Sequence, residues 1–130
     1  MDNRDYIFVK HNKDIVRIFL NDIHYIKADK DYCKIFTTNK MYYIHSTLGA
    51  LNEVLPQDKF CQCNRSFILN ISKIERVKRN EIFVEPTTFE IQKNHIVFDK
   101  SSIVIGLQYK KELLQKINRV KTSFEVRKAI

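Results

Sequence analysis

The sequence places a cation and an amide, Arg65 and Asn64, directly before three large apolar residues in the segment QCNRSFILN, residues 62–70. Arginine and asparagine side chains can hydrogen-bond base edges in pairs, and arginine also binds phosphate. A cation at the entrance of an apolar segment can instead be an ordinary ion-pair partner at the end of a buried strand. The pattern therefore predicts either a structural ion pair or a contact with an anionic partner outside the protein.

Cysteine and histidine side chains are the other candidates for chemistry. Cys61 and Cys63 are two residues apart and would lie on one face of a strand, where with a histidine they could hold a metal ion. Free cysteine more often behaves as a small buried hydrophobe. The four histidines stand singly, in separate segments. We therefore expect the cysteines to pack in the core, and we expect no metal and no cofactor. The histidines are His11, His24, His45 and His95.

Catalytic motifs and a membrane location are both disfavoured by the sequence. The chain has only two glycines, and it contains no phosphate-binding glycine loop, no G-x-S-x-G and no H-E-x-x-H. It also has no apolar run of about 18 residues, and its first residues are charged, unlike a secretion signal. Three cysteines without C-x-x-C spacing suit a reducing compartment. We expect a single-domain, cytoplasmic protein that is not an enzyme and has no membrane partner.

Basic charge is the remaining indication of function. Lysine and arginine number 23 against 15 acidic residues, a formal net charge of +8, which attracts polyanions. The cations are dense in residues 59–80 and again after residue 108. Contacts from such cations to phosphates give salt-dependent affinity without sequence preference. Charge alone leaves nucleic-acid binding and a merely solvated basic surface about equally open.

The elements that position these residues are predicted by a hydrophobic period near two. In DIVRIFL, for example, Val16, Ile18 and Leu20 share one face. Short alternating runs of this kind, separated by polar turn pairs, indicate an all-β fold of mostly antiparallel sheets. The predicted strands are residues 6–10, 14–20, 23–28, 31–38, 40–45, 60–64, 66–71, 74–79, 81–85, 88–92, 95–98 and 101–105.

Two segments interrupt the strand pattern with helical spacing. STLGALNEVLP offers Ser46 or Thr47 as an amino-terminal cap and ends at Pro56, so it predicts one short internal helix. From Gln108 to about Val120, apolar residues recur three or four apart with lysines between them, which predicts a C-terminal helix.

Several blocks, in order and at fitting distances, resemble the LytTR family of bacterial DNA-binding domains over about residues 7–117. The resemblance implies a mostly antiparallel β fold in which loops, rather than a recognition helix, enter adjacent major grooves. It also implies a DNA-binding domain over residues 1–117, followed at 118–130 by a tail or a helix extension. The blocks are Asp22-Ile23 with Tyr25-Ile26, Ser46-Thr47-Leu48, Arg65-Ser66-Phe67-Ile68-Leu69-Asn70 ahead of Lys73-Ile74, and Tyr109-Lys110-Lys111-Glu112-Leu113.

The same resemblance assigns DNA contacts to three loops. The family commonly has histidine where Asn64 stands and arginine where Leu107 stands. Leu107 can offer only an apolar contact, so either a base contact is lost at this position or a neighbour such as Gln108 or Lys110 takes it over. The resemblance further implies a transcriptional regulator, the output domain of a two-component response regulator, bound as two copies to direct repeats in double-stranded DNA. The loops are Lys30-Asp31-Tyr32, Asn64-Arg65 and Gly106-Leu107-Gln108, with Lys110 just after the third.

On this interpretation Arg65 extends from the protein edge toward a guanine or a phosphate, while Phe67 and either Ile68 or Leu69 anchor its strand in the core. Asn70 is expected to turn the chain after the strand, through a side-chain bond to the backbone.

Two alternatives from other classes stay open. One is a small β-barrel that stacks single-stranded nucleic acid on Tyr25, Tyr32, Tyr42 and Tyr43. The other is a non-enzymatic protein-interaction module whose basic face is incidental. Titration with duplex and single strands of one sequence separates the first alternative from a duplex reader.

Overall fold

The computed structural model describes residues 5–87 and 102–117. Within these residues the chain is mostly strand, with two α-helices and a few short 3-10 turns. The strands predicted at 88–92 and 95–98 lie outside the described residues, as does the expected tail at 118–130. Those expectations stay predictions.

A five-stranded sheet forms the centre of the molecule, with the strand order β5-β4-β3-β7-β6. Each neighbouring pair in it is antiparallel. The central strand β3 pairs with both β4 and β7, so it joins the first part of the sheet to the β6–β7 hairpin. The strands are β3 (Ile23–Asp29), β4 (Tyr32–Thr37), β5 (Met41–Ile44), β6 (Phe60–Asn64) and β7 (Phe67–Asn70).

Two smaller units flank this sheet. The hairpin of β1 (Tyr6–His11) and β2 (Asp14–Phe19) is one. The other is a three-stranded antiparallel sheet, ordered β10-β9-β8, of β8 (Ile74–Lys78), β9 (Glu81–Val84) and β10 (Ser102–Val104). Every strand that the sequence predicts in the described residues is present, with ends within one residue of those expected. The predicted fold class is confirmed.

The internal helix α1 (Leu48–Val54) begins after Thr47, whose Oγ1 accepts a hydrogen bond from Ala50 N at 3.1 Å. That bond satisfies one of the amide groups left unpaired at a helix start. Leu55 is already extended, as expected for a residue before proline, and its side chain is buried while that of Val54 points to solvent.

The C-terminal helix α3 (Lys110–Lys116) is shorter than the sequence predicts. Residues 107–109 form a 3-10 turn, so the helix starts two residues later than Gln108. Ile117 has φ −74° and ψ 118°, which is extended backbone, so the predicted continuation of the helix through Ile117 is wrong. The rest of the predicted helix, to about Val120, lies outside the described residues. Ile117 packs against the core in this conformation.

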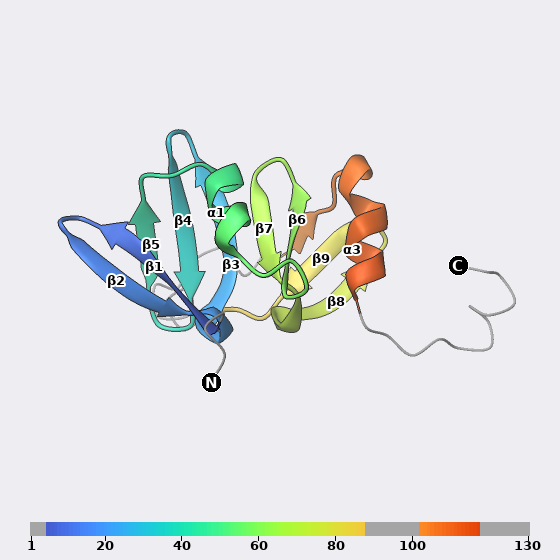
Figure 1. The fold of residues 1–130 in the computed structure, drawn as a ribbon. Helices are drawn as coiled ribbons and strands as arrows, with labels where there is room; N and C mark the ends of the chain where they lie inside the picture. The colour runs from blue at the N-terminus through green and yellow to red at the C-terminus, as the bar shows by residue number, and fades with distance from the viewer. Residues whose placement is uncertain (1–4, 88–101, 118–130) are drawn as a thin grey trace, which may run out of the picture.

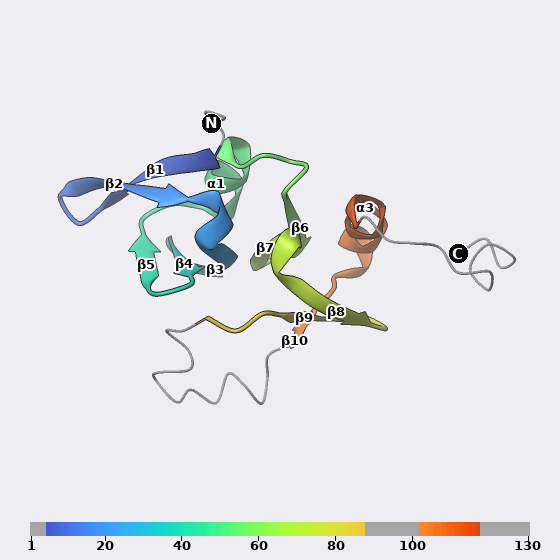
Figure 2. The same ribbon diagram turned by 90° about the horizontal axis from the view of Figure 1, so that it is seen from below.

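Two clusters of buried apolar side chains lie on opposite faces of the central sheet, and Figure 2 shows the elements that cover them. The first cluster lies under α1 and the β1–β2 hairpin, and the second lies against the β8–β9–β10 sheet and α3. Strand β7 contributes Ile68 to the first cluster and Leu69 to the second, because successive side chains of a strand point to opposite faces. Both residues are fully buried. The β6–β7 hairpin is therefore held from two sides.

Neither described helix has the length and apolar character needed to cross a lipid bilayer.

Candidate nucleic-acid interface

Three connections between elements lie at one end of the molecule, at the top in Figure 1. They are the β3–β4 turn, the β6–β7 turn and the segment from β10 to α3. Since β3 runs antiparallel to both β4 and β7, the sheet itself brings the first two turns to the same end. Ala28 N donates to Ser66 O at 2.8 Å, which fixes the second turn beside β3. The three loops that the family resemblance indicates are thus neighbours in space.

The β3–β4 turn is held by a group of polar and aromatic side chains around it. Tyr43 Oη donates to Asp29 Oδ2 at 3.0 Å, and the ring of Tyr43 stacks on that of Tyr32 with centroids 4.6 Å apart. His45 continues this aromatic row, with its ring centroid 4.8 Å from that of Tyr32. Lys30, at the tip, has φ 57°, a left-handed conformation uncommon for a residue other than glycine. Sequence reasoning missed Asp29 and His45, because only the register of β3, β4 and β5 brings them to Tyr32 and Tyr43.

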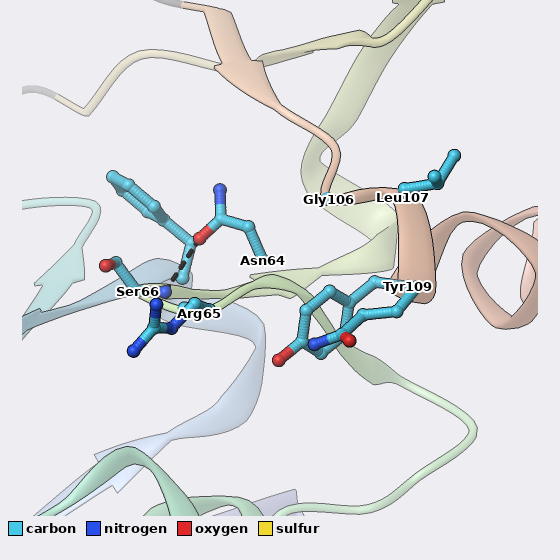
Figure 3. Close-up of a pocket in the computed structure, with 8 residues that line it drawn as sticks. Asn64, Arg65, Ser66, Gly106, Leu107 and Tyr109 are labelled. Atoms are coloured by element: carbon cyan, nitrogen blue, oxygen red, sulfur yellow. Dashed lines mark hydrogen bonds between the residues drawn. The ribbon is translucent and has the colours of Figure 1, made fainter.

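The second and third loops line one hollow of about 700 Å³ (Figure 3). Asn64 connects them: its Nδ2 donates to Val104 O and its Oδ1 accepts from Ser66 N, both at 2.7 Å. A second bond between the loops runs from Gly106 N to Cys63 O at 2.8 Å. The two loops therefore form one continuous surface. The lining residues are Asn64, Arg65, Ser66, Phe67, Gly106, Leu107, Gln108 and Tyr109.

Gly106 is required by close packing rather than by its backbone angles, since its φ is −69°. A Cβ added at this position would lie 2.9 Å from Tyr109 Cδ2 and 3.5 Å from Asn64 Cα. The first distance is shorter than real side chains allow, so the Tyr109 ring would have to move. Tyr109 also donates its backbone N–H to Gly106 O at 2.9 Å, which closes the 3-10 turn before α3.

The guanidinium of Arg65 lies on the exposed tip of the β6–β7 turn. Among the described residues, no carboxylate lies within 4.0 Å of its nitrogen atoms or of Lys30 Nζ. The structural ion pair that the sequence left open for Arg65 is thus not formed in this part of the chain. Phe67 is half-buried, and Ile68 and Leu69 anchor the strand behind it, as expected.

The third loop presents different side chains. Gln108 is exposed, and Leu107, at the edge of the hollow, is 91% exposed (Figure 3). Lys110 Nζ donates to Asn80 Oδ1 at 3.0 Å, so this cation is turned toward the β8–β9 turn. Ile105 N also donates to Asn80 O, at 2.7 Å. Asn80 therefore supports the loop from its far side, a role the sequence did not indicate.

The tyrosines proposed as stacking platforms do not form an open row. Tyr25 stacks on Phe36 with ring centroids 4.5 Å apart and is partly buried. Tyr42 is partly buried against the first core cluster. The exposed pair, Tyr32 and Tyr43, stack on each other, so one ring covers a face of the other. This arrangement gives little support to continuous base stacking.

Cys61, Cys63 and His24 pack as structural residues. Cys61 and Cys63 belong to the second core cluster, and burial raises the pKa of the Cys63 thiol to about 12. A thiol that stays protonated is a poor metal ligand, since metals bind the thiolate. His24 is buried, and its Nδ1 donates to Glu85 O at 2.7 Å. His95 lies outside the described residues.

The fold and these loops define a class of protein: a rigid β scaffold that presents cationic and amide side chains on loops at one end. Comparison with known families identifies it more narrowly. The family model of the LytTr DNA-binding domain matches residues 13–118. The chain belongs to the LytTR family of DNA-binding domains, which is defined by binding and not by a catalysed reaction.

Two regulatory proteins are similar to the chain over part of their length. The chain is 30% identical over 101 residues to the sensory transduction protein LytT of Bacillus anthracis, and this match covers 78% of the chain and 38% of the relative. It is 27% identical over 74 residues to the transcriptional regulatory protein YpdB of Escherichia coli K12, covering 57% of the chain and 30% of the relative. The chain therefore spans less than half the length of these relatives.

A solved structure has the same fold. The LytTr DNA-binding domain of a Bacillus cereus response regulator superposes with a TM-score of 0.64 and 14% sequence identity, covering 90% of this chain and all of that one. At this identity the likeness concerns the fold alone.

Proposed function

We propose that this protein is a sequence-specific, double-stranded DNA-binding regulator of transcription whose three loops enter adjacent major grooves on one side of the duplex. The observation that carries the proposal is the position of Lys30, Arg65 and Gln108. All three are exposed and all three belong to loops at one end of the molecule. Side chains held in this way on rigid turns can meet base edges and phosphates at fixed separations.

Each loop residue has a chemical role in this proposal. Arg65 reads a guanine or contacts a phosphate, and the amide of Gln108 reads an adenine. Lys30 and Lys110 contact phosphates, Lys110 through the N–H groups that its bond to Asn80 does not use, and these contacts give salt-dependent affinity. Leu107 makes an apolar contact to a thymine methyl group in place of the arginine common in the family. The proposed interface also includes Asp31, Tyr32, Asn64 and Gly106.

For the whole protein we propose the role of the DNA-binding output part of a response regulator in a bacterial two-component system, acting in the cytoplasm. The names of the relatives, a sensory transduction protein and a transcriptional regulatory protein, support this role. We further propose that two copies bind side by side to direct repeats. The domain over residues 1–117, followed by a tail or a helix extension, belongs to the same proposal.

Selection of bound sequences from a random duplex pool tests the proposal, because it examines DNA binding, site sequence and repeat spacing together. The selected duplex, a scrambled duplex and the two separate strands are then titrated at several salt concentrations. We expect the selected duplex to bind most tightly, with affinity that falls as salt rises. Tighter binding of a single strand would support the stacking alternative instead. Absence of salt-dependent binding to any of them would support the protein-interaction module.

A further inference from the structure

The half-buried side chain of Asn64 hydrogen-bonds to the protein backbone at the point where two proposed reading loops meet. Its Nδ2 donates to Val104 O, 40 residues away in the sequence, and its Oδ1 accepts from Ser66 N. An asparagine that reads adenine presents its oxygen and its amide nitrogen to the base together. With the oxygen bonded to Ser66 N and one N–H bonded to Val104 O, the Asn64 amide is held in an orientation set by the protein backbone, which leaves one acceptor site and one N–H for any other partner.

Three further contacts hold the same junction. Gly106 N donates to Cys63 O at 2.8 Å, beside the Asn64 bond to Val104. Gln62 Nε2 donates to Asn64 O at 3.0 Å, and the ladder between β6 and β7 shifts register between Gln62 and Asn64. Gly106 lies beside the Asn64 backbone, where an added Cβ would make an ordinary van der Waals contact with Asn64 Cα at 3.5 Å. The two loops are thus joined by main-chain contact as well as by one side-chain amide.

We propose that Asn64 is a positioning residue that fixes the distance and orientation between Arg65 on one loop and Gln108 on the other, so that the two side chains read neighbouring bases as one unit. This inference rests on the proposed function. Arg65 directly follows Asn64, and Gln108 lies two residues after Gly106. Both reading side chains are long and exposed. Their selectivity therefore depends on how firmly the backbone beneath them is held.

The substitution Asn64→Ser separates this role from others. A serine hydroxyl can still accept from Ser66 N in the same kind of local turn, but it is too short to reach Val104 O. It also introduces no charge, so phosphate contacts are not altered directly. Asn39→Ser is the matched control, because Asn39 is an exposed turn residue between β4 and β5, at the end of the sheet opposite the three loops (Figure 1).

Sequence selection and affinity measurements compare Asn64→Ser with Arg65→Ala, Gln108→Ala, the control and the unchanged protein. We expect Asn64→Ser to weaken binding to the selected duplex by roughly two- to tenfold, the range of one neutral hydrogen bond. Asn64→Ser should also lose base preference at two sets of positions: the base pairs that Arg65→Ala affects and the base pairs that Gln108→Ala affects. Affinity for a scrambled duplex and the salt dependence should stay unchanged, and Asn39→Ser should behave like the unchanged protein.

Two results with DNA would overturn the inference. Loss of preference at a single base pair that neither of the other variants affects would make Asn64 a base reader. An unchanged preference, with or without lower thermal stability, would leave Asn64 only a structural role.

A measurement without DNA distinguishes failure of the inference from failure of the proposed function. Hydrogen exchange of the Gly106 amide should become about two- to tenfold faster in Asn64→Ser, since the bond to Cys63 O loses the support of its neighbour. Unchanged exchange would overturn the inference. If the unchanged protein prefers no duplex, the proposed function fails, and the exchange result still decides whether Asn64 joins the loops.

Discussion

At the scale of single residues, Arg65 has an exposed side chain on a backbone that its neighbours hold in place. Its neighbour Asn64 holds the turn through two hydrogen bonds, and Ile68 and Leu69 bury the strand that follows. Removal of the Arg65 side chain should therefore leave the core untouched. Any effect of such a change on binding reports the contact that the guanidinium makes.

We predict that Arg65→Ala lowers the affinity for the selected duplex by about 1–3 kcal/mol, the size of one bidentate base contact. The thermal midpoint should stay the same. Fluorescence titration of the duplex and a thermal melt measure the two quantities. Arg17→Ala is the control for loss of one positive charge, because Arg17 lies on β2 over the rings of Tyr6 and Phe19. Equal losses in both variants would count against a base contact at Arg65.

At the scale of elements, the end of β7 is joined to the turn before β3 by one buried side chain. Asn70 is 3% exposed, and its Nδ2 donates to Leu20 O at 3.2 Å and to Ile23 O at 2.8 Å. Its Oδ1 accepts from Ser72 N at 3.0 Å, which confirms the expected turn through the side chain. The bonds to Leu20 and Ile23 add a link between elements that the sequence did not indicate.

We predict that Asn70→Ala lowers the free energy of unfolding by about 1–3 kcal/mol, because buried carbonyl groups lose their donor. Urea denaturation measures the change. The matched control is Asn52→Ala on α1. Among the described residues, Asn52 Oδ1 is a buried oxygen without a hydrogen-bond partner. Its removal should raise the free energy of unfolding by roughly 0.5 kcal/mol or leave it unchanged, since alanine also favours helix. Equal destabilisation by both changes would contradict the assigned role of Asn70.

The β3–β4 turn gives a prediction for pH. The hydrogen bond from Tyr43 to Asp29 raises the pKa of Tyr43, with partial desolvation as a smaller cause. A raised pKa means that folding favours the neutral phenol. The stabilisation is therefore complete below the ordinary tyrosine pKa of about 10 and is lost as pH rises through the raised value. Tyr43→Phe removes this ionisation.

We expect the difference in unfolding free energy between the unchanged protein and Tyr43→Phe to stay constant below about pH 10 and to fall above it. Urea denaturation at a series of pH values measures the difference. In an Asp29→Asn background the fall should be much smaller, because the carboxylate is gone. A difference that does not vary with pH would show that the hydrogen bond does not control the ionisation of Tyr43.

The strands and α1 could be predicted from the sequence because their signals are local. The alternation of apolar residues predicted the ends of the strands to within one residue. Thr47 and Pro56 likewise predicted where α1 begins and ends. The limits of α3 could not be predicted in the same way. Its apolar spacing continues past Lys116, yet the chain turns extended there so that Ile117 packs on the second core cluster. A tertiary contact overrides the helical pattern at that point.

The candidate site was only partly predictable for a related reason. The loops were indicated by family resemblance, and Arg65 by its place before an apolar run. Three features of the site depend on contacts between residues distant in the sequence. They are the bond from Asn64 to the backbone of Val104, the bond from Lys110 to Asn80, and the stack of Tyr32 on Tyr43. Residue types alone do not tell whether an amide faces a partner or its own backbone.

At the scale of the whole molecule, the placement of the loops at one end bears on how the two proposed copies would share a site. Two copies that lie side by side on one face of the duplex need repeats separated by whole helical turns of about 10–10.5 base pairs. We predict that inserting about 5 base pairs between the selected repeats lowers the affinity of the second copy by about 1–3 kcal/mol, and that inserting about 10 restores it. Gel-shift titration measures both, with one scrambled repeat as the control. Equal binding at every spacing would mean that the copies bind independently.

Strand β7 contributes one face to each of the two buried clusters, and this has a consequence for engineering the protein. A chimera joined within the β6–β7 hairpin would have to match two cores at once. The tips of the loops, by contrast, can be exchanged while that shared strand stays intact. Under the proposed function, new operator preferences should therefore be sought by grafting loop tips between relatives, with the whole of β7 inherited from one parent.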